Sequence, residues 1–196
     1  MAELLVDFIT SLDGYGAAEG WPGWWGLEGP EYLAWLDQVS DRGWTTLMGA
    51  TTYRLMSGFA AGAIETGPDE DDAMAEVTRS PKVVFSSTLE EPVTWANTRL
   101  VRGDAVEEVR SMKAAGTSMR TLGSATLCRS LLAAGLVDRF RVVVFPVVTG
   151  ASGRDRIYDG WPDVALELIE SRTFDGRSQL FEFVPTVLDG PPGQGS

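Results

Sequence analysis

The chain has 196 residues and a mass of 21.2 kDa, with 16 basic and 28 acidic residues and a net charge of −12. This length predicts one domain, and a hydrophobic fraction of 44% predicts a buried core rather than disorder. The negative charge repels phosphate backbones and anionic lipid surfaces. Non-specific nucleic-acid binding and membrane association are therefore not expected.

Histidine is absent, and Cys128 is the single cysteine. These counts exclude Ser-His-Asp and Cys-His nucleophile pairs, histidine metal sites, cysteine zinc clusters and an intrachain disulfide. No run of 18 apolar residues occurs, and Glu3 and Asp7 interrupt an N-terminus that has no basic leader. We therefore expect a soluble cytoplasmic protein without a metal site.

In the first half of the chain, residues 60–80 are rich in glycine, alanine and acidic residues, which predicts an exposed loop with one helical turn at most. The spacing of the acidic residues does not match an EF-hand calcium loop. The other elements expected here are a strand at 4–11, a helix at 30–42, a strand at 44–48, a short helix at 50–57 and a strand at 82–86.

In the second half, strands alternate with helices and end in a hairpin around Asp175-Gly176. This order predicts an α/β fold with a mostly parallel central sheet and an antiparallel C-terminal hairpin. We expect one domain over residues 1–184 and a flexible tail over 185–196. The elements are strands at 99–102, 119–122 and 139–148, helices at 104–115 and 125–134, and hairpin strands at 164–172 and 177–184.

Two strand-to-helix junctions are candidate phosphate sites. At Gly123-Ser124, a buried strand leads directly into a helix, where free backbone N–H groups and the helix dipole favour a pyrophosphate. The alternative is an ordinary strand–helix turn with Ser124 as the helix cap. At the second junction, after Gly49, Thr51 and Thr52 either donate to phosphate or cap the helix. No P-loop or complete dinucleotide-binding glycine motif is present.

Candidate substrate residues precede the second strand. Asp13 follows the first strand, where its carboxylate binds substrate hydroxyls, serves in proton transfer or forms an Asp-Gly turn. Glu31 and Tyr32 begin the first predicted helix, and either side chain could face a cleft, although a solvated helix start is the alternative for Glu31. Three tryptophans in a glycine-rich loop either stack on a flat heterocycle or cover an edge of the core: Trp21, Trp24 and Trp25.

Several segments, in order, resemble the dihydrofolate-reductase-like superfamily over residues 3–184. The resemblance is greatest to the branch that includes the reductase domain of the bifunctional riboflavin-biosynthesis deaminase/reductase. The segments are Ser11-Leu-Asp-Gly14, Leu47-Met-Gly-Ala-Thr-Thr-Tyr53, Lys82-Val-Val-Phe-Ser-Ser-Thr-Leu89, Leu122-Gly-Ser-Ala-Thr-Leu127, Leu131-Leu-Ala-Ala-Gly-Leu-Val-Asp138 and Phe145-Pro-Val-Val-Thr-Gly150.

The resemblance implies a three-layer fold, hydride transfer from NADPH to a small pterin- or pyrimidine-like heterocycle, and a homodimer through residues 142–148 or the C-terminal hairpin. We take Asp13 and Tyr32 as candidate catalytic residues, and the loop tryptophans with Glu31 as candidate substrate-binding residues. The residues implied to bind the cofactor are Gly49, Thr51, Thr52, Ser86, Ser87, Gly123, Ser124, Ala125 and Thr126.

Two arginines of the family pattern are missing, because Ala50 follows Gly49 and Ser87 follows Ser86. Both lie where cations near the 2′-phosphate of NADPH are implied, which leaves NADH as an alternative unless Arg54, Lys82 or Arg102 replaces them. Glu31 is also one position earlier than the carboxylate of dihydrofolate reductase, a turn of about 100° on a helix. The other hypotheses are a non-catalytic flavin- or nucleotide-binding protein and a dimerisation module.

Overall fold

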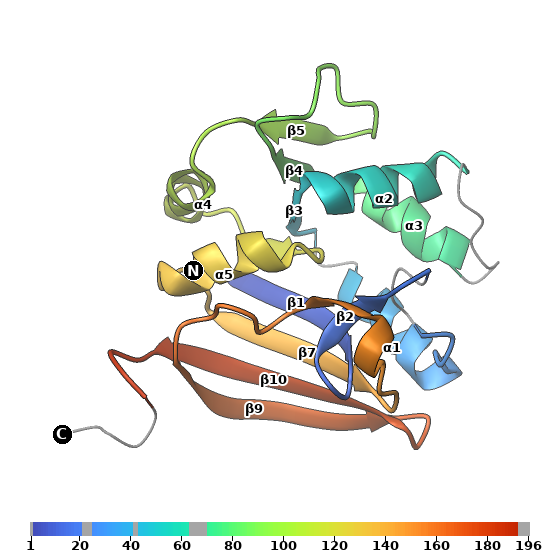
Figure 1. Cartoon of the computed structure of the whole chain (residues 1–196). Coiled ribbons are helices and arrows are strands. Elements are labelled where there is room, and N and C mark those ends of the chain that lie inside the picture. The colour runs from blue at the N-terminus through green and yellow to red at the C-terminus, as the bar shows by residue number, and fades with distance from the viewer. Residues whose placement is uncertain (1, 21–24, 41–42, 63–69, 192–196) are drawn as a thin grey trace.

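A computed structural model describes residues 2–20, 25–40, 43–62 and 70–191 (Figure 1). The strands are β1 (Leu4–Ser11), β2 (Tyr15–Ala18), β3 (Thr45–Gly49), β4 (Lys82–Phe85), β5 (Thr98–Val101), β6 (Met119–Thr121), β7 (Arg139–Phe145), β8 (Gly153–Arg156), β9 (Val164–Phe174) and β10 (Ser178–Val187). The helices are α1 (Pro30–Ser40), α2 (Ala50–Ala60), α3 (Glu70–Arg79), α4 (Ala105–Ala114), α5 (Ala125–Ala133) and a short 3-10 helix, η1 (Gly150–Ser152).

The main sheet has the strand order β5-β4-β3-β6-β1-β7-β10-β9. The first six strands in this order are parallel, and β10 pairs antiparallel with both β7 and β9. The predicted α/β fold with a parallel sheet and an antiparallel hairpin is confirmed. Because the six parallel strands point the same way, their carboxyl ends lie along one edge of the sheet, where such folds bind ligands.

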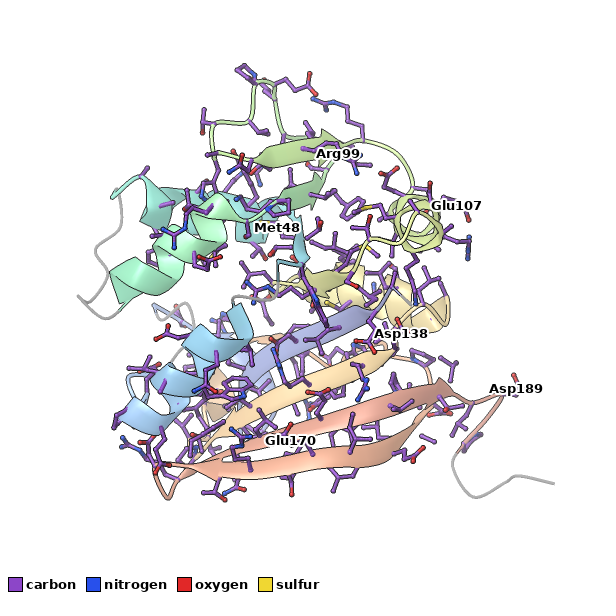
Figure 2. All side chains as sticks on the ribbon, turned by 180° about the vertical axis from the view of Figure 1, so that it is seen from behind. Met48, Arg99, Glu107, Asp138, Glu170 and Asp189 are labelled. Carbon is purple, nitrogen blue, oxygen red and sulfur yellow. The ribbon has the colours of Figure 1, made fainter. Side chains whose placement is uncertain are left out.

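Helices cover both faces of the sheet, which makes three layers. On one face, α4 and α5 pack their apolar side chains against β1, β3, β6 and β7, and Val109 and Leu131 are fully buried there. On the other face, α1 packs over β7 and β10, and α2 and α3 pack over β3 and β4. Figure 2 shows Met48 of β3 inside the molecule and Glu107 at the surface of α4.

Helix α3 lies in the segment predicted to be a loop, and that prediction was wrong over residues 70–79. Its sequence is highly acidic and has little helical signal, but the side chain of a lysine three residues after its last residue closes its C-terminal end. The Lys82 Nζ donates hydrogen bonds of 2.8, 2.9 and 2.7 Å to the carbonyl oxygens of Val77, Thr78 and Ser80. Charged donors near a helix C-terminus satisfy its free carbonyls and favour its dipole.

The structure also extends and adds to the predicted strands. The hairpin is longer than predicted, and β10 ends at Val187, three residues into the segment expected to be a tail. A two-stranded sheet of β2 and β8 was not predicted. It pairs segments that are far apart in sequence, such as Tyr15 with Arg156, and neither strand has an alternating apolar pattern.

Candidate cofactor and substrate site

The two predicted phosphate sites meet in space at the carboxyl edge of β3 and β6. The Gly49 amide donates a 2.7 Å hydrogen bond to the Ser124 Oγ, which is also 2.9 Å from the Thr52 Oγ1. Gly123 has a φ of +55°, and a side chain there would begin only 3.2 Å from the Thr52 Oγ1. Glycine therefore allows the two junctions to approach each other closely.

Ser124 does not cap its own helix, so the alternative of an ordinary capping serine is wrong. Its backbone lies in the left-handed region at φ 66°, and its side chain makes no hydrogen bond that caps α5. Gly49, the N-cap residue of α2, has no side chain that could cap that helix. The first-turn amides of a helix have no partner within the helix. Two neighbouring helices thus direct amides and the positive ends of their dipoles at one place, which fits a pyrophosphate.

Ser86 and Ser87 follow β4 on the same edge, where they form a tight turn. The Ser86 Oγ accepts hydrogen bonds from the amides of Thr88 and Leu89, at 3.1 and 3.0 Å. Arg102, which follows β5, donates to the carbonyl oxygens of Ser87 at 3.3 Å and Leu89 at 2.7 Å. An arginine from the neighbouring strand is therefore held against this turn, although residue 87 is a serine.

Both carboxylate oxygens of Asp13 accept hydrogen bonds from neighbouring residues. Its Oδ1 accepts from the Ser11 hydroxyl at 2.6 Å and the Thr149 amide at 3.2 Å, and its Oδ2 accepts from the Gly150 amide at 2.9 Å. The hydrogen bonds from Ser11 and Gly150 lower the pKa of Asp13 to about 2. Asp13 is therefore ionised at neutral pH, where it fixes the turn after β7 and has no proton to donate.

Tyr32 lies in the aromatic core and not beside the two junctions. It is 2% exposed, and its ring packs 5.4 Å from Phe145 and 5.8 Å from Phe174, centroid to centroid. Burial raises the pKa of Tyr32 well above its usual value, with a further contribution from the charge of Asp7. The structure gives Tyr32 a packing role.

Glu31 is held in a reciprocal cap between α1 and the β9–β10 turn. Its carboxylate accepts a 2.6 Å hydrogen bond from the Asp175 amide, and the Asp175 carboxylate accepts from the amides of Glu31 and Tyr32, at 3.1 and 3.2 Å. Gly29 leaves room for this contact, since a Cβ there would lie 2.2 Å from the Asp175 Cγ. Glu31 thus anchors the helix start.

Of the three tryptophans predicted to bind substrate, the structure describes only Trp25. Trp21 and Trp24 lie outside the described residues. Trp25 packs against the aromatic cluster under α1, which agrees with the alternative that it covers an edge of the core.

One strip of the central sheet is not fully covered by helices. On the face towards α1 and α2, the side chains of Asp7 and Ile9 on β1 and of Arg120 on β6 are partly exposed, and we call these three residues the open strip. On the opposite face of the same strands, Val6 and Met119 are almost fully buried. The strip follows from the spacing of the helices, because α1 lies over β7 while α2 lies over β3.

The open strip contains charges that sequence reasoning missed. The Arg141 guanidinium on β7 binds both carboxylate oxygens of Asp7, at 3.1 and 2.5 Å, and lies 4.8 Å from the Trp35 ring centroid. Burial acts to lower the pKa of Arg141, but the charge and hydrogen bonds of Asp7 raise it on balance. A lone charge inside an apolar strand, as in Leu-Leu-Val-Asp-Phe, was the available signal.

Arg120 differs from Arg141 in its partners. Its Nε donates one long hydrogen bond, 3.4 Å, to the Thr46 Oγ1. Burial lowers the pKa of Arg120, while the negative charges of Asp7 and of Glu76 on α3 act to raise it. The side chain lies on β6 three residues before Gly123, so the open strip leads from Arg120 towards the two junctions.

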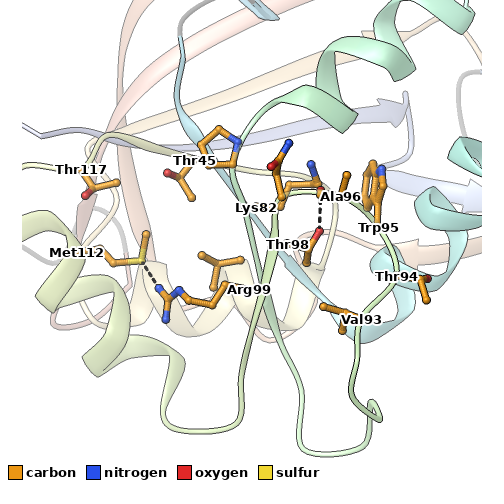
Figure 3. A pocket seen from close by; sticks show the side chains of 13 residues that line it. Thr45, Lys82, Val93, Thr94, Trp95, Ala96, Thr98, Arg99, Met112 and Thr117 are labelled. Carbon is orange, nitrogen blue, oxygen red and sulfur yellow. Dashed lines mark hydrogen bonds between the residues drawn. The ribbon is translucent and has the colours of Figure 1, made fainter.

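A separate hollow of about 630 Å³ lies at the opposite, amino-terminal edge of β3, β4 and β5 (Figure 3). Its cations are occupied: Arg99 pairs with Glu108 at 2.6 Å, and the Lys82 Nζ binds the end of α3. Nothing in its lining matches the predicted site. In the described part of the chain, no group of three or more His, Cys, Asp or Glu residues is arranged to hold a metal ion, and no helix is long and apolar enough to cross a membrane.

Comparison with known proteins finds relatives in sequence and in structure. An uncharacterised protein of Bacillus subtilis (strain 168), YyaP, is 26% identical over 175 residues, which cover 87% of this chain and 88% of the relative. A crystal structure of a putative riboflavin biosynthesis protein from Shewanella sp. PV-4 matches with a TM-score of 0.73 at 20% identity, over 95% of this chain and 99% of the other.

Two further structures are more distant. A deaminase/5-amino-6-(5-phosphoribosylamino)uracil reductase of Thermotoga maritima has a TM-score of 0.62 at 15% identity, over 94% of this chain and 57% of the other. Dihydrofolate reductase from Enterococcus faecalis, complexed with NADP(H), has a TM-score of 0.58 at 12% identity, over 93% and 96%. The family model of the RibD C-terminal domain matches residues 2–180, nearly the whole chain, and the protein therefore belongs to the RibD C-terminal domain family.

Proposed function

We propose that this protein is an NAD(P)H-dependent reductase of a small pterin- or pyrimidine-like heterocycle. The observation that carries the proposal is the pair of helix N-termini that Ser124 joins at the carboxyl edge, beside the open strip. A bound nicotinamide coenzyme would supply the hydride, while the protein supplies binding, orientation and electrostatics. Such a reductase would act in the cytoplasm.

In this proposal, different residues at the carboxyl edge bind different parts of the coenzyme and the substrate. The first-turn amides of α2 and α5 hold the pyrophosphate, and the exposed hydroxyls of Thr51 and Thr126 add hydrogen-bond donors. The Ser86–Ser87 turn receives the adenosine end. Leu12 and Val148, which are 67% and 66% exposed, form an apolar lip next to Asp13 for the flat ring of the substrate.

The first test is thermal stabilisation by NADPH, NADH and flavin mononucleotide, each over a concentration series. A ligand that binds only the folded protein adds about 2.7 kcal/mol at a hundredfold excess over its dissociation constant. A shift with NADPH or NADH, followed by coenzyme oxidation in a screen of pterins and pyrimidines, is the expected result. Absence of any nicotinamide shift up to millimolar concentration contradicts the proposal.

The Thr126→Glu variant locates the binding site. A carboxylate in the first turn of α5 favours the helix dipole, so the free protein should unfold at the same or a slightly higher temperature. The same charge repels the pyrophosphate, and NADPH affinity should fall about tenfold or more. Ser130→Glu, one turn further along the exposed face of α5, is the matched control and should bind NADPH as the original protein does.

We propose NADPH as the preferred coenzyme, with Arg102 in the role of the missing family arginines. Arg102 already lies against the Ser86–Ser87 turn through its bond to the Ser87 carbonyl oxygen. Arg102→Gln should weaken NADPH binding about tenfold and leave NADH binding unchanged, because only NADPH carries the 2′-phosphate. Arg99→Gln, at the other end of the same strand, is the control. Equal loss for both coenzymes contradicts this role.

A second candidate is a non-catalytic protein that binds a flavin or another nucleotide at the same edge. It is favoured by the missing cations at residues 50 and 87, by the hydrogen bonds that both Asp13 oxygens accept within the protein, and by the burial of Tyr32. The flavin arm of the stabilisation experiment separates the two. A flavin shift without a nicotinamide shift supports the second candidate.

We also propose that a second copy of the chain covers the β9–β10 hairpin. Its apolar residues Leu166, Leu168 and Ile169 are exposed, and β9 is an edge strand of eleven residues. Long exposed edges with apolar side chains are normally covered. Sedimentation should show a dimer that Leu168→Glu converts to a monomer, whereas Glu167→Gln keeps the dimer.

A further inference from the structure

We propose that acylation of the lysines in this protein requires its fold to open: Lys82 and Lys113 become modification sites only in molecules that have locally unfolded. The acyl donor is an activated acyl group of the acyl phosphate or thioester class. An acyl group on Lys82 then prevents the opened segment from closing again. This inference goes beyond the proposed function and does not depend on it.

The distribution of amines along the chain is the first support. Of its 16 basic residues, Lys82 and Lys113 are the two lysines, and the other 14 are arginines. The lysine amine is the group that acylation modifies, whereas the arginine guanidinium stays protonated. Neither lysine is fully exposed, so every exposed cationic side chain in the described part of the chain is an arginine.

Lys82 is enclosed by β4, α3 and the loop before β5. The residue is only 2% exposed, although it contributes to the wall of the hollow in Figure 3. Its Nζ donates to three carbonyl oxygens at the end of α3 and lies 4.8 Å from the centroid of the Trp95 ring. Because an ammonium has three donors, all of them are used. A reagent reaches this nitrogen only when α3 or the loop moves away.

Lys113 is held less completely, where α4 meets the start of β7. Its Nζ donates to the Leu136 carbonyl oxygen at 2.8 Å and to the Asp138 Oδ2 at 2.6 Å, and its side chain is 21% exposed. The Leu4 amide donates to the same Asp138 oxygen at 2.7 Å, so the ion pair connects α4 to the start of β1. The amine has to leave this ion pair before it can react.

The acylation step explains why an opened molecule stays open. The neutral lysine nitrogen attacks the acyl carbon, the N–C bond forms as the bond to the phosphate or thiolate leaving group breaks, and the amine proton passes to water. The product is a neutral amide with one N–H. On Lys82, this single N–H replaces three donors at the end of α3, and the acyl group has to fit into an enclosed site. Two carbonyl oxygens lose their donor, which opposes closure.

Charge and enclosure predict opposite reactivities for Lys82. Burial lowers the pKa of Lys82 to about 8, so more of its amine is neutral at mildly alkaline pH than that of an ordinary lysine. If the charge state alone controlled acylation, Lys82 would react faster than Lys113. Enclosure predicts the reverse order, because Lys82 is the less exposed of the two.

The test treats the folded Arg110→Lys variant with the N-hydroxysuccinimide ester of acetate at mildly alkaline pH and follows each lysine by peptide mass spectrometry. The Arg110 side chain on α4 is 51% exposed, so the introduced lysine is an accessible reference in the same molecule. We expect Lys113 to react at least about tenfold more slowly than this reference, and Lys82 at least about a hundredfold more slowly, because both depend on local opening. In concentrated urea the three rates should converge.

Two results overturn the requirement for opening: Lys82 reacts as fast as Lys113 or faster in the folded protein, or its rate lies within about tenfold of the reference. Should Arg110→Lys not fold, Arg177→Lys in the exposed β9–β10 turn supplies the reference.

A second measurement tests whether the modified molecule can close. The Lys113→Arg variant, which keeps Lys82 as its single lysine, is acetylated in urea and then diluted. It should fail to regain the melting transition that the same variant shows after urea without the reagent. Arg110→Lys, acetylated while folded, is the control and should keep its transition. Full recovery of the acetylated Lys113→Arg protein refutes the effect on closure.

Discussion

The two faces of the central sheet are built from the same strands but differ in what covers them. Towards α4 and α5, β1 presents Leu4, Val6 and Phe8 to a continuous apolar core. Towards α1 and α2, the alternate positions of β1 include Asp7 and Ile9, which are partly exposed. One face is thus closed and apolar, whereas the other is open at its centre and charged. The contrast separates the part of the molecule that stabilises the fold from the part available to a ligand.

The largest expected effect is on the closed face. Leu131 of α5 is fully buried in that core, so Leu131→Ala should lower the free energy of unfolding by about 2–5 kcal/mol. Denaturant unfolding measures the change. Ala134→Gly, at the C-cap of the same helix, is a mild control. A loss below about 1 kcal/mol would show that this face is not the main source of stability.

The next effect concerns the charged pair under α1. The Arg141 side chain is 3% exposed and that of Asp7 is 23% exposed, so Arg141→Met should leave Asp7 partly buried without its partner. We expect a loss of about 3 kcal/mol, because an unpaired buried charge is costly. The double variant Asp7→Leu/Arg141→Met should recover most of that stability. Additive losses in the double variant contradict the pairing.

Arg120→Met sharpens the comparison with Arg141→Met. Both variants remove an arginine from the same face, but Arg120 has no carboxylate within 4.0 Å among the described side chains. Its removal should therefore leave the free energy of unfolding unchanged or raise it slightly, by up to about 1 kcal/mol. The same denaturant experiment measures it. A loss comparable to that of Arg141→Met would place Arg120 in the structural network.

The smallest effect is a pH dependence at the edge of the sheet. The folded pKa of Asp13, about 2, lies below its unfolded value, so its contribution to stability is complete above about pH 4 and is lost as the pH falls towards 2. Asp13→Asn should thus be less stable than the original protein at neutral pH, and the gap should close between about pH 4 and pH 2. Unfolding curves at these pH values test this. A gap independent of pH would contradict it.

The sequence was most informative where an element depends only on residues close to it along the chain. A helix was predicted from residue 104, and there the Asp104 carboxylate caps α4 by accepting hydrogen bonds from the Val106 and Glu107 amides. The strand–glycine–helix junctions at Gly49 and Gly123 were also found, because a buried strand, a glycine and a helix start leave a contiguous pattern. The hairpin around Asp175 followed from its turn residues.

The sequence was least informative where a partner comes from far along the chain. The start of α1 depends on Asp175, more than 140 residues away. Tyr32 and Glu31 were attractive candidates by their position near the first helix start, but packing and capping determine what their side chains do. The charged residues of the open strip were overlooked, because each is one polar letter in an apolar strand.

The sequence by itself determined three things. The alternation of strands and helices determined the fold class, and the absence of histidine excluded several catalytic chemistries. The glycine junctions determined the edge of the sheet at which to look for a cofactor. Local pattern suffices there, since helix starts and strand ends depend on neighbouring residues. Only the tertiary structure decided that Ser124 joins two helix starts, that Asp13 is a turn anchor and that Arg120 is partly exposed on the face of the sheet towards α1 and α2. These three properties depend on which distant segments pack together across the sheet, because that packing sets the burial and the charged neighbours of each side chain.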